Sequence, residues 1–262
     1  MIGAIWRYRG FVWSSVRRDV LARYRGSLLG SMWAILNPLT LILIYTVIFS
    51  RIMKARLPNL EDPFAYGLYL CVGILTWNYF SEVLSRSQIM FLEQGSLIKK
   101  TNFPRSTLPV IVVGTATLNF ATVFGLFFLF LILTDRFPGW ISLELIPLLI
   151  VQLSFAVGLG LILGTLNVFF RDVGQVVAIV LRFWFWLTPI VYPISILSEG
   201  NQSRIMTWNP LAKFVVAYQN LVLLGSRPAW VTFIPHGIVA AAVLVFGYVI
   251  FVKLSGEMVD EL

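Results

Sequence analysis

The chain has 262 residues, of which 58% are hydrophobic and only 12% are charged, and it carries a formal net charge of +8. A soluble domain has about 25% charged residues, so this composition excludes an ordinary soluble protein and indicates an integral membrane protein. The single cysteine, Cys71, excludes an intrachain disulfide. We interpret the excess of Lys and Arg as a signal for membrane orientation and lipid contact, not for nucleic-acid binding.

Six apolar segments are long enough to cross a bilayer as helices, which takes about 20 residues each. A lone strand would leave backbone polar groups unsatisfied in lipid, so we expect an all-α integral membrane protein. It forms one domain, residues 1–262, with an N-terminal segment (1–27), a six-span region (28–252) and a tail (253–262). The predicted spans are Leu28–Ser50, Phe64–Leu84, Leu108–Thr134, Leu145–Phe170, Val173–Pro193 and Trp230–Val252.

The distribution of basic residues predicts that both termini are cytoplasmic. Six spans place the two ends of the chain on one side, and six arginines precede the first span. Lys and Arg are enriched in the cytoplasmic segments of membrane proteins. On the same predicted side, Arg171 and Asp172 separate spans four and five, and adjacent opposite charges fit a tight turn between two helices.

The N-terminal segment has the pattern of an amphipathic helix lying at the membrane surface. Arg9, Asp19 and Arg23 interrupt its apolar face. The alternative to an interfacial helix is a basic tail whose only role is to set the membrane topology. The residues that share the apolar face are Ile5, Tyr8, Val12, Val16 and Val20.

Two connections between spans are unusual. Residues 93–109 form a polar, basic segment broken by Pro104 and Pro109, which is either a solvated loop or a docking site for another protein. Leu211–Leu224 is apolar but too short to cross, and Pro210 and Gly225 bracket it, which predicts a re-entrant or interfacial helix.

Small, charged and aromatic residues inside the spans each allow two interpretations. Gly160 and Gly164 favour close helix packing within the chain, with a dimer face as the alternative. Arg182 is either functional or extends its guanidinium back to the membrane surface. The aromatics of spans two and five either line a path for a neutral glycan or fill the helix-packing core.

The chain lacks the motifs of a catalyst. It has no G-x-x-x-x-G-K-[ST] phosphate loop. The only histidine, His236, has no cluster of possible metal ligands in the sequence, so we interpret it as structural. One His and one Cys cannot build a nucleophile–base–orienter set. We therefore predict a non-catalytic protein with no metal site.

Several segments, in this order, resemble a known family. They are RYRGSLLGSMWAILNPL, SLIKKTNFPRSTLP, NVFFRDVGQVV, FWLTPIVYP and TWNPLAKFVVAYQNLV. Together they are similar to the transmembrane subunits of ABC-2 type polysaccharide exporters, which export O antigen, capsule and teichoic acid, and most similar to the O-antigen exporters.

The resemblance implies a homodimer in the bacterial inner membrane, paired with two copies of a separate ATPase that holds ATP and Mg. No cofactor belongs to this chain. The cargo implied is an undecaprenyl-pyrophosphate-linked polysaccharide, and short outer-leaflet helices gate its exit. One alternative is an ABC-2 exporter of a lipid or drug. The other, from a different class of protein, is a membrane glycosyltransferase or a standalone channel.

The resemblance also implies roles for particular residues. A coupling helix would dock on the ATPase through Gln94, Ser96, Leu97, Ile98, Lys99, Lys100, Asn102, Phe103 and Arg105. The glycan channel would draw on Tyr45, Trp77, Tyr79, Phe80, Phe183, Trp184, Trp186 and Tyr192. The N-terminal arginines Arg7, Arg18, Arg23 and Arg25 are candidates to receive the pyrophosphate.

Overall fold

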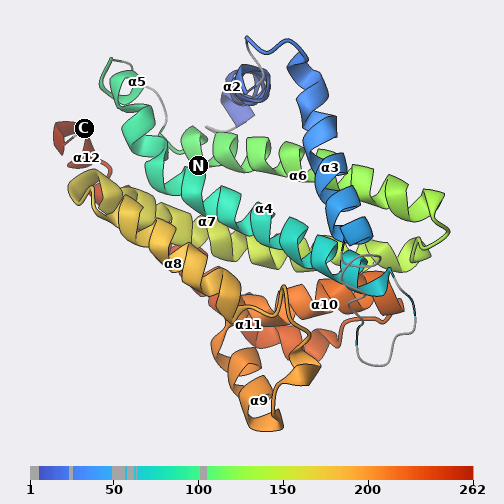
Figure 1. The fold of residues 1–262 in the computed structure, drawn as a ribbon. Helices are drawn as coiled ribbons and strands as arrows, with labels where there is room; N and C mark the ends of the chain where they lie inside the picture. The colour runs from blue at the N-terminus through green and yellow to red at the C-terminus, as the bar shows by residue number, and fades with distance from the viewer. Residues whose placement is uncertain are drawn as a thin grey trace.

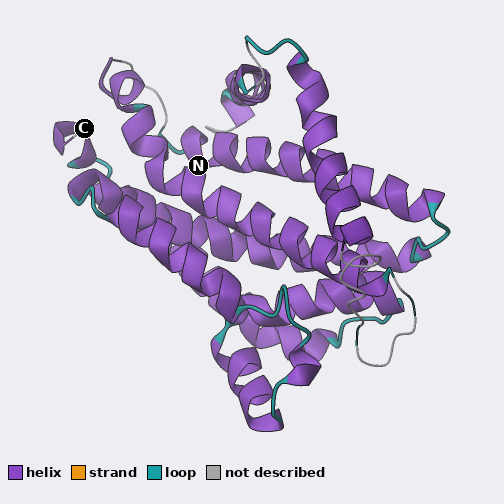
Figure 2. Ribbon diagram, in the orientation of Figure 1, coloured by secondary structure: helices purple, strands orange, loops and turns teal. Residues whose placement is uncertain are grey.

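The computed structural model describes residues 6–23, 26–48, 57, 62, 64–100 and 105–261, without the side chains of residues 31, 96, 97 and 100. All regular structure in these residues is helical, as predicted (Figures 1 and 2). The α-helices are α2 (Arg9–Ala22), α3 (Trp33–Val47), α4 (Ala65–Glu93), α5 (Gly95–Lys100), α6 (Thr107–Leu133), α7 (Leu145–Phe169), α8 (Val173–Leu187), α9 (Glu199–Trp208), α10 (Pro210–Leu224), α11 (Ile234–Leu254) and α12 (Met258–Glu261). Short 3-10 helices are η1 (Gly30–Met32), η3 (Gly139–Glu144), η4 (Ile194–Ile196) and η5 (Trp230–Phe233).

Helix α4 lies at the centre of the fold. It packs against α3, α6, α7, α8 and α10, and 19 of its 29 residues are buried. A helix buried on most of its circumference can carry apolar residues on every side, which is why the hydrophobic pattern of this segment has no single face. The helix extends beyond the span predicted for this segment, Phe64–Leu84, because α4 continues to Glu93.

The fold has two distinct ends (Figure 1). At one end lie α5 and α12, with α12 packed on α5 and α7, while α2 packs on α6 and shares a cavity with the end of α4. At the other end α10 packs against α4, and α9 packs on α10. The segments predicted to be cytoplasmic therefore share one end, and the apolar connection predicted to be extracytoplasmic is at the other.

Three helices in the described residues are both long and apolar enough to cross a membrane. They are Thr107–Leu133, Gly139–Phe169 and Trp230–Leu254. Helix α4 is long enough, at ~44 Å for 29 residues, but more polar. Helices α3 and α8 have 15 residues each, or ~22 Å, and are shorter than the spans predicted for them.

The shortening of α8 has a local cause. The predicted span runs to Pro193, but α8 ends at Leu187 and Thr188 is extended, with ψ 136°. Thr188 precedes Pro189, and the proline ring disfavours the helical conformation of the residue before it. The chain then turns into the core, where Ile190 is fully buried.

Glycines allow the long helices to approach closely. A Cβ on Gly160 would lie 2.4 Å from the Ser87 side chain, and one on Gly164 would lie 2.5 Å from the Ser87 carbonyl oxygen on α4. On the opposite side of α7, a Cβ on Gly158 would meet the backbone of α11 at 2.6 Å. These small residues pack α7 between its two neighbours, which agrees with the prediction of packing within the chain.

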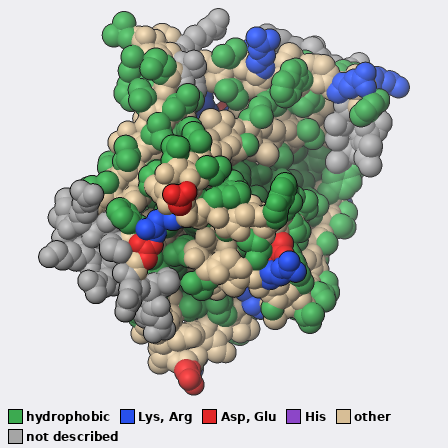
Figure 3. Space-filling view, turned by 90° about the vertical axis from the view of Figure 1, so that its right-hand side faces the viewer, with side chains coloured by type: hydrophobic (Ala, Val, Ile, Leu, Met, Phe, Trp, Pro, Cys, Tyr) green, Lys and Arg blue, Asp and Glu red, His purple; other side chains and the backbone are tan. Residues whose placement is uncertain are grey.

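The surface is largely apolar. In Figure 3, hydrophobic side chains are spread over the face shown, and Lys and Arg side chains lie at its upper edge and, lower down, beside Asp and Glu. Helices α3 and α8 also expose large apolar side chains, among them Leu43, Ile179 and Trp186. Such surface fits lipid or a second protein chain.

Candidate functional site

The predicted coupling segment contains a short helix at the end of α4. Gln94 lies between α4 and α5, and Ile98 N donates to the Gln94 carbonyl oxygen (3.0 Å). The Ile98 side chain is buried in a cluster with Phe91, Leu108 and Met258, whereas Lys99 is exposed. One side of α5 is thus fixed to the core and a basic residue is left accessible. Arg105 is half-buried, the side chains of Ser96, Leu97 and Lys100 are not described, and Asn102 and Phe103 lie outside the described residues.

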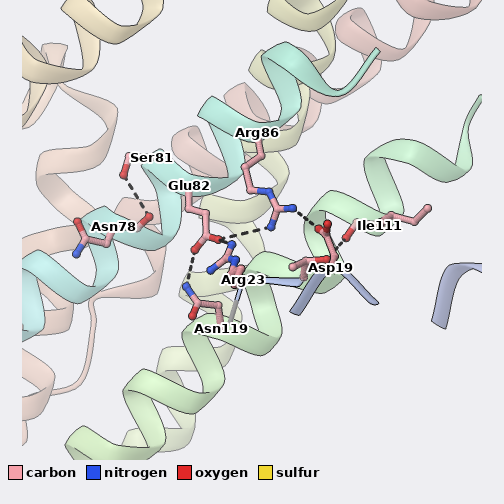
Figure 4. A network of polar contacts seen from close by, with 9 residues as sticks. Asp19, Arg23, Asn78, Ser81, Glu82, Arg86, Ile111 and Asn119 are labelled. Atoms are coloured by element: carbon pink, nitrogen blue, oxygen red, sulfur yellow. Dashed lines mark hydrogen bonds and ion pairs between the residues drawn. The ribbon is translucent and has the colours of Figure 1, made fainter. Parts of the chain in front are cut away.

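A network of charged side chains connects the N-terminal helix to the centre of the fold (Figure 4). Arg86 on α4 pairs with Asp19 on α2, and Arg23, at the C-terminal end of α2, pairs with Glu82 on α4. Glu82 also lies 3.7 Å from Arg86 Nη1 and accepts a hydrogen bond from Asn119 Nδ2 on α6 (2.7 Å). Opposite charges therefore hold α2 against α4 and α6.

This network corrects part of the expectation for α2. Val12, Val16 and Val20 do lie on its buried or half-buried side, but so does Asp19, which we expected only to interrupt the apolar face. The reason is that α2 packs on α6 and also pairs with α4, so a charged residue on that side has a partner.

The four arginines proposed to receive a pyrophosphate lie in different surroundings. Arg7 and Arg18 are exposed, and Arg18 lines a cavity of about 280 Å³ between α2, α4 and α6. Arg23 is engaged by Glu82, so its charge is already balanced within the chain. Arg25 lies outside the described residues. The role of these residues remains a prediction.

The aromatic candidates fall into a buried group and an exposed group. Trp77, Tyr79 and Phe80 are at most 5% exposed and pack inside the chain. The Trp184 ring is 5.4 Å from Phe80 and 6.3 Å from Trp77, measured between centroids. These contacts favour the core-packing interpretation for the buried group in this conformation.

Phe183 and Trp186, in contrast, are 69% and 64% exposed on the outer side of α8. Arg182 is exposed on the same helix and makes no ion pair with the described part of the chain. Tyr45 and Tyr192 are half-buried. Only part of the predicted aromatic set is therefore available to a molecule outside the single chain.

The end of α8 is tied to α10 by side-chain hydrogen bonds. Trp184 Nε1 donates to Asn209 Oδ1 (2.9 Å), and Asn209 Nδ2 donates to Thr188 Oγ1 (3.0 Å). Asn209 also caps α10, accepting from Leu211 N, and Gly225 ends α10 in the left-handed conformation (φ 58°). The predicted bounds of this short helix are thus correct, with Asn209 as an unpredicted link to α8.

Helix α10 is inserted into the core and is not laid on the surface. Tyr218 is fully buried, and its hydroxyl donates to Gln152 Oε1 on α7 (2.7 Å). Gln152 Nε2 in turn donates to the Thr76 carbonyl oxygen on α4 (3.2 Å). This chain of polar groups fixes α10 relative to both long helices.

A tight turn joins α7 and α8. Phe170 ends α7 in an extended conformation, and Arg171 and Asp172, both exposed, precede α8. Asn167 stabilises the turn, since its Nδ2 donates to the Gln88 carbonyl oxygen on α4 and its Oδ1 accepts from Gly174 N. The turn lies near the end of the fold that carries α5.

The sequence comparisons match this chain to a known group. Residues 11–223 match the family described as ABC-2 type transporter. The chain belongs to the ABC-2 type transporter family. Its relatives include the O-antigen export system permease protein RfbA of Myxococcus xanthus, 33% identical over 84% of this chain and 82% of the relative. RfbA of Klebsiella pneumoniae is 34% identical over 79% of this chain and 78% of the relative. The polysialic acid transport protein KpsM of Escherichia coli is 26% identical over 79% of each chain.

This ABC-2 transporter chain also has features that sequence reasoning missed. Glu82 and Arg86 are four residues apart on a helix, a spacing that forms ion pairs, and this signal was present in the sequence. Their pairing with Asp19 and Arg23 joins segments more than 50 residues apart, which no local pattern reveals. In the described residues no group of His, Cys, Asp and Glu is arranged to hold a metal ion.

Proposed function

We propose that this chain is the membrane subunit of an ATP-driven exporter that carries a lipid-linked, O-antigen-like polysaccharide across the bacterial inner membrane. The observation that carries the proposal is the similarity to three permease or transport proteins named for polysaccharide export, each over more than three quarters of both chains. A similarity this extensive includes the segments that form α2, α5 and α10, not only the apolar spans.

The topology of the proposal has six spans and cytoplasmic termini. The spans are α3, α4, α6, α7, α8 and α11. The 15-residue helices α3 and α8 are supplemented by flanking segments and by α10, whose side chains hydrogen-bond to buried polar groups of α4 and α7. Backbone that is not helical is tolerated in a membrane where protein surrounds it.

In this proposal α5 transmits the conformational change of a separate ATPase subunit. Ile98 fixes α5 to the core, and α5 directly follows α4, which lies at the centre of the fold. A displacement of α5 would act on a 29-residue helix that packs against α3, α6, α7, α8 and α10. Lys99 is the described basic side chain available for docking, with Lys100 beside it in the sequence.

The glycan path of the proposal lies where two copies of the chain meet. The exposed aromatics Phe183 and Trp186 on α8 are the channel candidates that this conformation supports best. Flat aromatic rings hold the C–H faces of sugars without requiring one sequence of hydroxyl groups, so a repetitive glycan can move past them.

The test is to remove this chain from its bacterium. Cells without it are expected to lose surface polysaccharide and to accumulate the lipid-linked glycan on the cytoplasmic face of the inner membrane, and re-expression is expected to restore export. Normal surface polysaccharide, together with a changed sensitivity to drugs or a changed outer lipid composition, would instead favour an ABC-2 exporter of a drug or lipid.

A further inference from the structure

A cavity of about 250 Å³ lies between α3, α4 and α6. Arg23, which follows α2, and Glu82 on α4 lie at one end of it. Two carboxamides in its wall, Asn37 on α3 and Asn78 on α4, are exposed and have no side-chain hydrogen bond to the described residues. These amides each offer a donor and an acceptor to a bound molecule.

The polarity of the wall falls along the cavity on α4 and on α6, away from the charged end. On α4 the order from the charged end is Glu82, Asn78 and then Leu75, a rise of ~10 Å. On α6, Asn119 is followed by Phe120 and Val123. On α3, Asn37 is the polar residue of the wall, with Trp33 and Ala34 before it and Pro38 and Leu41 after it. The cavity is therefore polar at the end nearest α2 and apolar toward the middle of the helices. An amphipathic molecule fits this gradient, whereas a free sugar or a small ion does not.

The charges at the polar end distinguish between kinds of headgroup. Arg23 and Glu82 form an ion pair there, and Asn119 fixes the second oxygen of Glu82 (Figure 4). A purely anionic headgroup would be attracted by the guanidinium and repelled by the carboxylate. A zwitterion presents a group of opposite charge to each of them, so both interactions are favourable.

We propose that this cavity binds the headgroup of a zwitterionic, amine-bearing glycerophospholipid. The ammonium donates hydrogen bonds to Glu82, the phosphate accepts from Arg23, and Asn37 and Asn78 hydrogen-bond to the phosphate and ester oxygens. The start of an acyl chain lies along Leu41, Leu75 and Val123. The volume is below the ~300–1,000 Å³ of sites for drug-sized ligands, and it suits a headgroup whose chains extend beyond the cavity.

Such a lipid would also support α2. The same Glu82 and Arg23 hold the C-terminal end of α2 on α4, so a headgroup bound beside this ion pair adds contacts to both elements. This inference does not depend on the proposed export function, because it concerns only binding by the chain.

The test is native mass spectrometry of the purified chain with phosphatidylethanolamine, phosphatidylcholine and phosphatidylglycerol at equal concentration. The ethanolamine lipid is expected to bind about tenfold more tightly than phosphatidylcholine, which has no N–H to donate to Glu82. Equal binding of the three lipids, or a preference for phosphatidylglycerol, would overturn the proposal. Displacement by a monosaccharide would assign the cavity to a sugar and would also overturn it.

Three variants locate the site. Glu82→Gln is expected to remove the preference for the ethanolamine lipid, but it also weakens the attachment of α2. Asn78→Leu therefore serves as a second variant, because it fills the cavity without removing a hydrogen bond that the described chain makes, and it is expected to reduce lipid binding about tenfold. Glu144→Gln, at an acid paired with Arg227 outside the cavity, is the matched control and should bind as the wild type does. Unchanged binding to Asn78→Leu would refute the assignment.

Discussion

The contact between α7 and α11 gives a prediction whose size follows from measured distances. A Cβ added to Gly247 on α11 would lie 2.4 Å from the Gly158 carbonyl oxygen on α7. A carbon and a carbonyl oxygen in contact need about 3.3 Å. Gly247→Ala must therefore separate the two helices by about 1 Å, because the atom it meets belongs to backbone and cannot rotate away.

Such a separation weakens the most extensive helix pair of the fold. A gap of 0.5–1 Å forfeits about a quarter to a half of the dispersion energy of each affected contact. Overpacking of this kind costs about 1–3 kcal/mol, while alanine in place of glycine gains up to about 1 kcal/mol of helix propensity. We expect Gly247→Ala to destabilise the chain by about 1–2 kcal/mol.

The matched control is Gly237→Ala on the same helix, where an added Cβ meets nothing within 4 Å. This variant is expected to be neutral or more stable by up to about 1 kcal/mol. The measurement is unfolding of the purified chain in detergent, followed by tryptophan fluorescence and by loss of helical circular dichroism. If Gly247→Ala is as stable as Gly237→Ala, the close approach of α7 and α11 is refuted.

Three further predictions concern the functional contacts. Asp19→Asn and Arg86→Gln should each destabilise the attachment of α2 by about 1–2 kcal/mol, a moderate cost because both side chains are partly exposed. The double variant should lower the free energy of unfolding by less than the sum of the two single variants. Strictly additive unfolding energies would show that the two side chains are not coupled. Lys99→Glu combined with Lys100→Glu should leave the chain folded in the membrane but uncouple ATP hydrolysis from export, and normal surface polysaccharide in that variant would exclude α5 as the coupling element. Trp186→Ala should slow export without lowering the unfolding midpoint, because this side chain is 64% exposed; an unaltered export rate would exclude it from the glycan path.

Local sequence signals predicted several elements closely. The helix α10 was expected from an apolar run between Pro210 and Gly225, and it spans Pro210–Leu224. Helices α6 and α7 begin and end within one residue of their predictions. The ends of these segments are marked in the sequence by proline, by glycine or by a change from apolar to polar residues. Such signals act on the backbone close to them, so they can be read locally.

Other outcomes depended on packing between distant segments. The buried state of Trp77 and Phe80, as opposed to the exposure of Trp186, follows from which neighbours surround each helix. All three residues are apolar or aromatic within predicted spans, so composition does not separate a channel lining from a core. The order of helices around α4 makes that distinction in the structure.

Composition and spacing by themselves determined that this is an all-helical membrane protein with a basic segment between two apolar runs, because the bilayer admits few backbone structures. The tertiary structure alone decided that Asp19, Arg23, Glu82 and Arg86 form one network and that Ile98 fixes α5 to the core. The physical reason is the separation along the chain between the residues that interact. Helix formation responds to neighbouring residues, whereas an ion pair between α2 and α4 depends on where two helices meet after the chain has folded.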